Sequence, residues 1–203
     1  MIRGKPIVIS APSGGGKTTL CHQLLAANPA MTRAVTSTTR PPRPGERDGV
    51  DYHFLDPDSF RRRVEADEFL EHATVYGHSY GPLKSEVLGK LREGKDVLLS
   101  VDVQGAASIR AQAERDPELK RSLITVFLTT ASMGELEGRL HKRGTDSVAT
   151  IQKRLGVARA EIAQWKHFDY LLISTSIGED LRRMQCILEA EKMRQFRAPP
   201  PEF

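Results

Sequence analysis

Apolar residues along this chain follow two alternating patterns, short continuous runs and longer stretches with the spacing of a helix. The runs predict buried strands at residues 6–10, 96–101, 123–128 and 170–174. Helical spacing and capping signals predict helices from about Leu20 and at residues 83–92, 132–142, 150–166 and 178–195. Strands that alternate with helices predict an α/β fold, in which helices cover both faces of a central parallel sheet.

Residues 34–83 depart from this alternation. Short expected strands at 32–37, 50–55 and 69–75, a turn at 76–81 and a helix at 59–66 capped by Asp58 lie close together there. Between the first two of these strands, three prolines stiffen a loop at 38–49 that carries several arginines. We therefore expect a small β-rich insertion in the parallel-sheet core.

A glycine-rich stretch, Ala-Pro-Ser-Gly-Gly-Gly-Lys-Thr-Thr, lies between the first expected strand and the first expected helix. Glycines let backbone N–H groups converge on an anion, and the positive end of the following helix points at the same place. Lys17 supplies a cation for the outer phosphates, and the Thr18 hydroxyl can ligate Mg²⁺. The motif opens with alanine where the strict pattern has glycine, and it predicts a nucleoside-triphosphate site. The predicted binding residues are Ala11, Pro12, Ser13, Gly14, Gly15, Gly16, Lys17, Thr18 and Thr19.

Composition and charge change this picture only slightly. The chain has 203 residues and a net charge of +4, which fits an anionic ligand and a solubilising surface equally well. No apolar run reaches the about 18 residues of a membrane span, and the first residues leave no room for a signal peptide. Cys21 and Cys186 have no metal-like spacing, so we expect reduced thiols in a cytoplasmic protein. No basic stretch interleaved with aromatic residues indicates a nucleic-acid partner.

Polar residues outside the glycine-rich stretch indicate a second ligand. Arg40 and Arg43, three apart on the stiff loop, can form a planar clamp on a phosphate monoester. Tyr52 and Tyr80 can donate hydrogen bonds to the same group, although a tyrosine in a short strand is also typical of packing. Asp102 directly follows the expected strand at 96–101, at the sheet edge where ligands gather in open α/β folds.

A polar segment at residues 144–150 has no apolar anchor and is flanked by basic side chains. Those side chains are Arg139, Lys142, Arg143 and Arg154. The combination predicts a mobile flap that brings cations over a phosphate. The alternative is a plain loop between two charged helices.

Several stretches, in order along nearly the whole chain, resemble the guanylate kinase family. They are TSTTRPPRPGE at 36–46, GVDYHF at 49–54, EFLE at 68–71, YG at 80–81, DVQG at 102–105, RLHKRGTD at 139–146 and KRL at 153–155. The resemblance implies a P-loop NTPase fold in three layers, with a small β-rich GMP-binding insertion and a helical lid. It places the core at 1–33, 96–133 and 159–203, the insertion at 34–95 and the lid at 134–158.

The resemblance also implies a reaction, the Mg²⁺-dependent transfer of the ATP γ-phosphoryl group to GMP, and a set of site residues. For GMP, these are Thr36, Arg40, Arg43, Tyr52, Glu71, Tyr80, Asp102 and Arg154. For ATP, Arg139 and Arg143 join the residues of the glycine-rich stretch. The catalytic residues that it implies are Lys17, Arg40, Arg143 and Arg154. Thr18 would ligate Mg²⁺, with Asp102 acting through water.

The chemistry of guanine supports carboxylates at such a site. Guanine presents N1–H and N2–H₂ as adjacent donors that one carboxylate accepts together, whereas adenine presents a bare N1 acceptor. Sites built on such hydrogen bonds can reject the wrong ligand by about 10⁴-fold or more. Because the acceptor phosphate is already an anion, no strong general base is needed, and positioning and charge neutralisation carry the catalysis.

Four positions depart from the pattern of the family. Thr36 replaces a more common serine and keeps the hydroxyl, and Pro82 replaces a hydroxyl residue that helps to bind guanine. Ser100 stands where an acidic residue often precedes the Asp102 motif, and Ser174 replaces an asparagine near the adenine. We expect these departures to alter affinity or donor preference and to leave the activity in place.

Two other functions are weighed against this one. A guanylate-kinase-like binding module that recognises phosphorylated peptides typically lacks a working phosphate-binding loop, whereas Gly16, Lys17 and Thr18 are intact here. The other is a related P-loop kinase that acts on a different phosphorylated acceptor, such as a pyrimidine monophosphate or a ribose phosphate. An acceptor recognised only by its sugar has no use for the carboxylates Glu71 and Asp102, whereas the departures Pro82 and Ser100 keep this alternative open. The expected partners are therefore ATP and GMP, with no nucleic acid and no membrane, in a monomer or a homo-oligomer.

Overall fold

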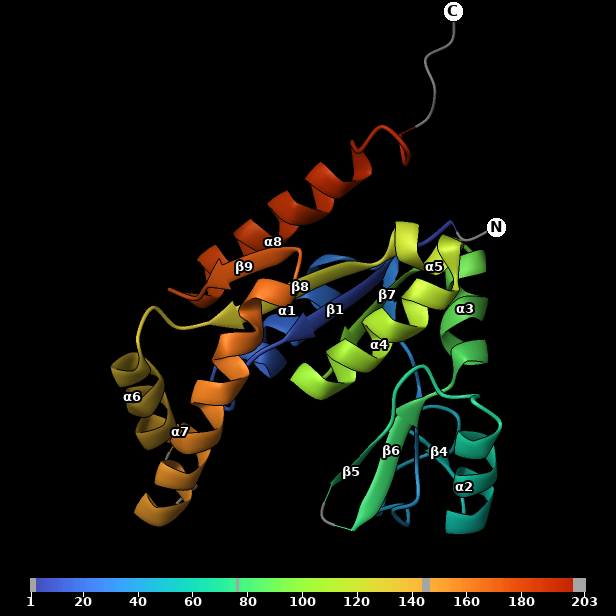
Figure 1. The fold of residues 1–203 in the computed structure, drawn as a ribbon, viewed down its shortest axis with the longest axis horizontal. Helices are drawn as coiled ribbons and strands as arrows, with labels where there is room; N and C mark the ends of the chain where they lie inside the picture. Colours follow the sequence, from blue (N-terminus) through green and yellow to red (C-terminus); the bar gives the residue numbers. More distant parts are fainter. Residues whose placement is uncertain (1–2, 76, 144–146, 199–203) are drawn as a thin grey trace, which may run out of the picture.

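The computed structural model describes residues 3–75, 77–143 and 147–198, which form two β-sheets with helices around them (Figure 1). The larger sheet has five parallel strands in the order β2-β7-β1-β8-β9. They are β1 (Pro6–Ser10), β2 (Met31–Arg33), β7 (Asp96–Ser100), β8 (Ile124–Thr129) and β9 (Tyr170–Ile173). Every residue of β1 is buried, and Ile7 pairs with both Leu98 and Ile124. The apolar runs therefore form the predicted parallel sheet.

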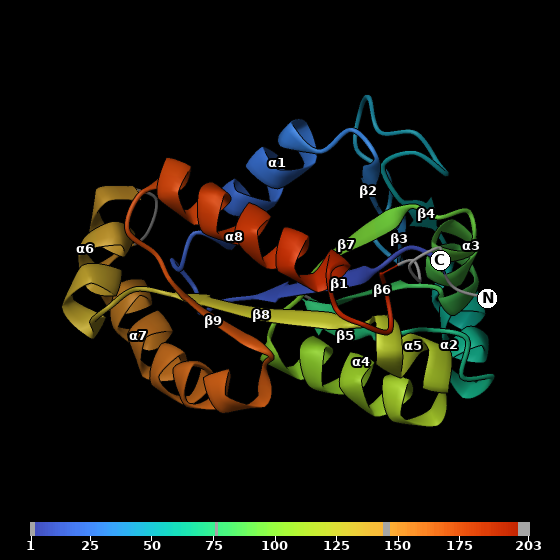
Figure 2. The ribbon, with the colours of Figure 1, turned by 90° about the horizontal axis from the view of Figure 1, so that it is seen from above.

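Helices cover both faces of this sheet, which confirms the three-layer prediction. On one face lie α1 (Lys17–Ala27) and α8 (Ile177–Lys192), and on the other lie α3 (Lys84–Arg92), α4 (Val103–Arg115) and α5 (Pro117–Ser122) (Figure 2). The first face buries Leu24 and Met184 completely, and the second buries Ile109 and Leu91. In the part of the chain that the structure describes, no helix is both long and apolar enough to cross a bilayer.

A pair of helices extends from the sheet beyond β8. It consists of α6 (Met133–Arg143) and α7 (Val148–Ile162), and a 3₁₀ helix, Ala163–His167, continues α7. The two helices share a small apolar cluster that includes Leu136, Leu140 and Ile151. Of the predicted flap at 144–150, residues 144–146 lie outside the described residues, and Val148 already begins α7, whose N-cap is Ser147.

The second sheet lies apart from the first and has four short strands in the order β4-β3-β6-β5 (Figure 1). They are β3 (Thr36–Thr38), β4 (His53–Phe54), β5 (Ala73–Val75) and β6 (His78–Pro82). Beside them, α2 (Pro57–Glu65) stacks Phe60 on Phe69 with ring centroids 4.3 Å apart. This is the small β-rich insertion that the sequence predicted.

The strand boundaries in this region were predicted less well. The single strand expected at 32–37 is wrong, because the chain leaves the larger sheet after Arg33 and enters the second sheet at Thr36. The strands expected at 50–55 and 69–75 shorten to β4 and β5. The turn expected at 76–81 is mostly strand β6, which pairs with β3 and β5; the turn itself includes Gly77, whose φ is +81°. Residues 78–82 form a strand because they pair with both β3 and β5, and a short stretch of sequence does not show which distant segments it will pair with.

Two predictions about helices need correction. Asp58 does not cap α2: Asp56 does, accepting a hydrogen bond of 2.8 Å from the Ser59 N–H, while Asp58 pairs with Arg61 on the surface. No helix was predicted between residues 103 and 122, where α4 and α5 lie. Their small and charged residues have weak apolar periodicity, and the helices form on the caps Asp102 and Asp116.

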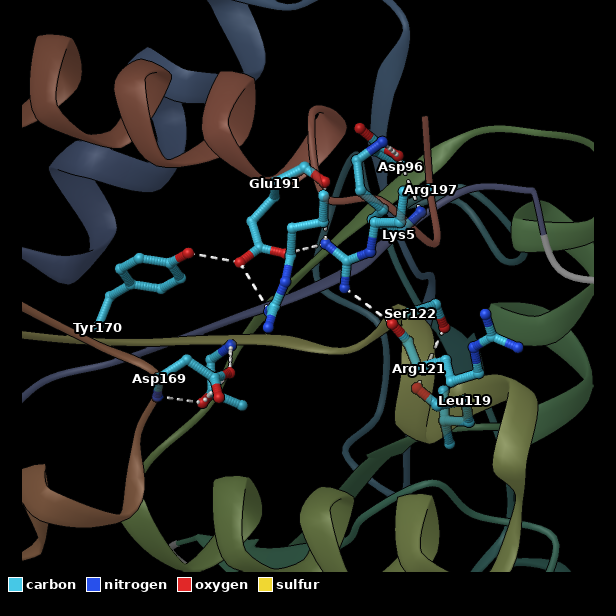
Figure 3. Close-up of polar contacts among 11 residues, drawn as sticks. Lys5, Asp96, Leu119, Arg121, Ser122, Asp169, Tyr170, Glu191 and Arg197 are labelled. Atoms are coloured by element: carbon cyan, nitrogen blue, oxygen red, sulfur yellow. Dashed lines mark hydrogen bonds and ion pairs between the residues drawn. The ribbon is translucent and has the colours of Figure 1, made fainter. Parts of the chain in front are cut away.

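A buried carboxylate ties the C-terminal segment to the body of the protein (Figure 3). Glu191, only 1% exposed, accepts hydrogen bonds from the Tyr170 hydroxyl and from Arg194 and Arg197. Arg197 also donates to the Arg121 carbonyl oxygen at 2.9 Å, which joins the segment after α8 to α5. Burial and the neighbouring carboxylate raise the pKa of Tyr170 to about 12, so its hydroxyl remains a donor at neutral pH.

Removing this hydroxyl should weaken the fold. We expect Tyr170→Phe to lower the free energy of unfolding by about 1.5 kcal/mol, because a buried carboxylate loses one of its hydrogen-bond donors. Denaturant unfolding measures the change. Lys192→Ala, next to Glu191 in sequence but in an exposed ion pair with Glu189, is the control and should cost less than about 0.5 kcal/mol. Equal losses in both variants would contradict the role given to the Tyr170 hydroxyl.

Candidate nucleotide site

The glycine-rich loop joins β1 to α1 at the carboxyl edge of the larger sheet. Gly14 and Gly16 have φ values of +86° and +95°, which disfavour other residues, and the Gly15 N–H donates to the Pro12 carbonyl oxygen at 2.9 Å. Among the described residues, no side chain caps the start of α1 at Gly16, and its first turn has no acidic residue. The N–H groups at this helix end are thus available to an anion.

Lys17, the first residue of α1, reaches across to the end of β7. Its Nζ donates a hydrogen bond of 2.6 Å to the Val101 carbonyl oxygen. Burial lowers the pKa of Lys17, while the nearby groups Cys21, Asp102, Glu161 and Glu71 favour its charged form. The ammonium group therefore lies in a partly buried site, facing several acidic groups.

Two cavities meet at this point. One, of about 450 Å³, lies between the larger sheet and the second sheet, and we call it the inter-sheet cavity. The other, of about 670 Å³, surrounds the glycine-rich loop, and we call it the loop cavity. Lys17, Thr18 and Asp102 line both. The other predicted residues that line the inter-sheet cavity are Thr36, Tyr52, Glu71 and Tyr80, together with the departures Pro82 and Ser100. Residues from 11 to 19 and Arg139 line the loop cavity.

Glu71 and Asp102 form an acidic pair in the inter-sheet cavity. Burial, and then the charge of Asp102, raise the pKa of Glu71 to about 7. Asp102 caps α4 by accepting a hydrogen bond of 2.8 Å from the Gly105 N–H. A Cβ on Gly105 would lie 3.0 Å from Glu71 Oε2, and one on Gly81 would lie 2.5 Å from the Glu71 carbonyl oxygen. The missing side chains of these two glycines leave room for the Glu71 carboxylate beside α4 and for the Glu71 backbone beside β6. The strand expected at 69–75 included Glu71, but in the structure Glu71 precedes β5 and lies outside any strand.

The predicted arginine clamp is not assembled in this structure. The Arg40 guanidinium binds both carboxylate oxygens of Glu46, at 2.8 and 2.9 Å, and lies over the Tyr52 ring, 5.3 Å from its centroid. Arg43 has an exposed side chain, and its backbone N–H donates to Glu46 at 2.7 Å. Neither arginine lines the inter-sheet cavity. Glu46 was not predicted as the ion-pair partner of Arg40, although it is an acidic residue only six positions away in the same loop.

The residues of α6 and α7 approach the loop from the other side. Arg154 lies 3.5 Å from the Ser13 Oγ, and Glu161 of the same helix lies near the Ser13 backbone. Sequence reasoning missed Glu161, which lines the loop cavity; its separation of seven residues from Arg154 places the two on one face of the helix. Burial raises the pKa of Glu161. The side chain of Arg143 lies outside the described part of the structure.

Comparisons with known proteins agree with this geometry. Residues 3–191 match the family model described as guanylate kinase. The chain is 41% identical to a guanylate kinase of Maricaulis maris, over 97% of this chain and 88% of that protein, and 43% identical to one of Sphingopyxis alaskensis, over 96% and 86%.

Solved structures give the same picture. The crystal structure of guanylate kinase from Anaplasma phagocytophilum has a TM-score of 0.70 and 31% identity, covering 97% of this chain and 90% of that one. A gluconokinase from Sinorhizobium meliloti, at a TM-score of 0.50 and 14% identity, covers 98% of this chain and all of that one, and it shows similarity of fold alone.

The raised pKa of Glu71 should make the ligand-free protein less stable as the pH rises. Between about pH 4.5 and 7 the unfolded chain has lost this proton while the folded chain retains it, so stability falls across that range. We expect the free energy of unfolding to fall between pH 5 and 8 by about 2 kcal/mol more in the parent than in Glu71→Gln, which has no proton to lose. Denaturant unfolding at several pH values measures the difference.

Glu68→Gln, three residues earlier and exposed, is the matched control and should retain the pH dependence of the parent. If Glu71→Gln also retains it, the carboxyl group of Glu71 ionises normally in the folded protein.

Proposed function

This chain belongs to the guanylate kinase family, and we propose that it transfers the γ-phosphoryl group of ATP to GMP, giving ADP and GDP. One observation carries the proposal beyond family membership. Lys17, Thr18 and Asp102 line both the loop cavity and the inter-sheet cavity, so a phosphate donor in the first and an acceptor in the second would meet at these residues.

We propose that the triphosphate occupies the loop cavity. The backbone N–H groups of residues 14–19 would bind the phosphates, and Lys17 would leave the Val101 carbonyl oxygen to contact the outer ones. Arg139, which lines the same cavity, supplies a further cation. This arrangement acts on charge and position, which is what phosphoryl transfer to an anionic acceptor requires.

The acidic pair supports guanine as the acceptor base. Glu71 in its ionised form would accept the guanine N1–H and N2–H₂ donors, with Asp102 and the Thr36 hydroxyl beside it in the cavity. A base that presents an acceptor to Glu71 would leave a half-buried carboxylate without a donor, which is the basis of discrimination. Pro82, opposite Thr36 in the second sheet, contributes shape and no hydroxyl.

The acceptor phosphate would be held by Arg40, Arg43, Tyr52 and Tyr80. The carboxylate of Glu46 now binds Arg40 through two oxygens, and a phosphate presents the same planar pair of acceptors. We propose that Arg40 exchanges Glu46 for the GMP phosphate when the second sheet approaches the loop. Tyr80 and Tyr52, with rings 6.3 Å apart, already line the cavity at that end.

We further propose that residues 34–95 act as the GMP-binding insertion and residues 134–158 as the lid. Within the first range, Val87 and Leu91 of α3 pack in the core of the larger sheet, so the part that can move ends before α3. In the lid, Arg154 already lies beside Ser13 of the loop, and Arg143 belongs to the same pair of helices. Closure would bring these arginines to the transferring group and exclude water.

The oxygen atoms at the junction of the cavities fit Mg²⁺. This ion keeps several waters and needs only one or two protein oxygens, which the Thr18 hydroxyl and the Asp102 carboxylate can supply, the latter through water. Among the described residues, no cluster of three or more His, Cys, Asp or Glu side chains could hold a metal instead. When bound, Mg²⁺ neutralises charge on the triphosphate.

The two alternatives are less well supported. A peptide-binding module does not need Lys17, Thr18 and an uncapped helix end, and a kinase for a sugar acceptor does not need Glu71 beside Asp102. Because both cysteines are free and the substrates are nucleotides, we propose that the protein works in the cytoplasm.

The experiment that tests the function is a measurement of ADP release with Mg·ATP and, separately, GMP, AMP, CMP and UMP. We expect turnover with GMP, and Lys17→Ala should lower kcat by about 10²-fold or more while the protein remains folded. Circular dichroism checks the fold of the variant. Turnover with another monophosphate in place of GMP would move the proposal to a different acceptor, and unchanged turnover in Lys17→Ala would overturn the assignment of the loop.

The role of Glu71 has its own test. We expect Glu71→Gln to lower kcat/KM for GMP by about 10²-fold, since one carboxylate oxygen is replaced by an NH₂ group that faces the guanine donors. The KM for ATP should stay within about twofold of the parent value, because Glu71 does not line the loop cavity. Steady-state kinetics with each substrate varied in turn measures both. Equal losses for GMP and ATP would show that Glu71 supports the fold and does not recognise the base.

A further inference from the structure

Three side chains from separate elements form a chain of hydrogen bonds beside the glycine-rich loop. The Ser174 hydroxyl, just after β9, donates to Asp180 Oδ2 of α8 at 2.6 Å and accepts a hydrogen bond of 2.9 Å from the Arg139 guanidinium of α6. Arg139 also lies 3.5 Å from the Ser174 carbonyl oxygen. Ser174 and Asp180 are 3% and 6% exposed, so the link is almost fully buried.

We propose that Asp180, acting through the Ser174 hydroxyl, positions the Arg139 guanidinium beside the glycine-rich loop for binding of the donor nucleotide. The inference rests on the proposed function, since it takes a nucleoside triphosphate as the ligand of that loop. Asp180 is a positioning residue here, because Arg139 is the group that faces the ligand.

The location of the guanidinium supports this role. Arg139 lines the loop cavity and also a neighbouring cavity of about 340 Å³. The lining of that second cavity includes Gly14, Gly16, Thr19, Ser174 and Asp180. A Cβ on Gly16 would lie only 3.6 Å from a guanidinium nitrogen of Arg139. The cation is therefore held over the start of α1, where the phosphates would lie.

The buried carboxylate explains why this cation stays in place. A serine hydroxyl has one proton to donate, and Ser174 donates it in the hydrogen bond to Asp180. An oxygen lone pair of Ser174 is therefore left to accept the hydrogen bond from Arg139. The other oxygen of Asp180, Oδ1, accepts a hydrogen bond of 3.0 Å from the Thr175 N–H, which fixes the carboxylate itself. With a different group at 180, the hydroxyl could rotate and present its proton toward the guanidinium.

The test is direct measurement of Mg·ATP binding by isothermal titration calorimetry, without an acceptor. In Asp180→Asn the amide NH₂ would face the Ser174 hydroxyl as a donor, so the relay to Arg139 is lost. We expect the Kd for ATP to rise about tenfold, which is the effect on affinity of losing one hydrogen bond to a charged group. Ser174→Ala removes the relay at its centre and should have the same effect if Asp180→Asn does not fold. Glu189→Gln, an exposed change on the same helix, is the control and should leave Kd within twofold.

Repeating the two substitutions in a protein that already carries Arg139→Ala separates positioning of Arg139 from a merely structural role. In Arg139→Ala, adding Asp180→Asn or Ser174→Ala should change the Kd for ATP by less than twofold, because the group they position is absent. The same tenfold loss in that background, or an unchanged Kd in the single variants, would overturn the inference. Failure of the parent protein to bind Mg·ATP would overturn the proposed function as well, whereas normal binding by every variant would overturn only the role of Asp180.

Discussion

The parallel pairing of β1 with its neighbours β7 and β8 is the constraint on which the rest of the structure depends. Parallel strands end at the same edge, so the loop after β1 and Asp102 after β7 must lie side by side. The pairing is stable because β1 is buried along its whole length. The hydrogen bond from Lys17 to the Val101 carbonyl oxygen follows directly from it, since this bond joins the start of α1 to the chain just beyond β7.

The same convergence gathers charge in a half-buried place. Burial lowers the pKa of Lys17 and raises the pKa of Glu71 and Glu161, which means that the ligand-free site carries groups that would be more stable in water. A ligand with phosphate oxygens for Lys17 and hydrogen-bond donors for Glu71 would satisfy both ends of the site. Buried ionisable groups of this kind lower the stability of the folded protein, and they are typical of functional sites.

The second sheet and the helical pair hold their cations differently. Arg40 is bound by Glu46 through both carboxylate oxygens, and a phosphate can replace this partner with the same geometry. Arg139 is held through Ser174 by Asp180, which is almost fully buried. The first arrangement suits a residue that moves with its sheet, and the second suits one that must be in place beforehand.

Much of this protein was determined by local sequence. Apolar runs predicted four of the five strands of the larger sheet, all but β2. The glycine-rich stretch predicted a phosphate-binding turn, because the backbone conformation at Gly14 and Gly16 depends on the residue itself. Cap chemistry was less decisive: two aspartates, Asp56 and Asp58, stand near the start of α2, and only the observed backbone identifies the first as the cap.

What tertiary structure decided was which distant groups meet. Residues 32–37 divide between two sheets, and β6 is a strand only because β3 and β5 pair with it on either side. The shared place of Glu161 and Arg154 at the loop, and the relay from Asp180 to Arg139, join elements far apart along the chain. Such contacts depend on the packing of whole helices and strands, which periodicity and spacing along one segment do not contain.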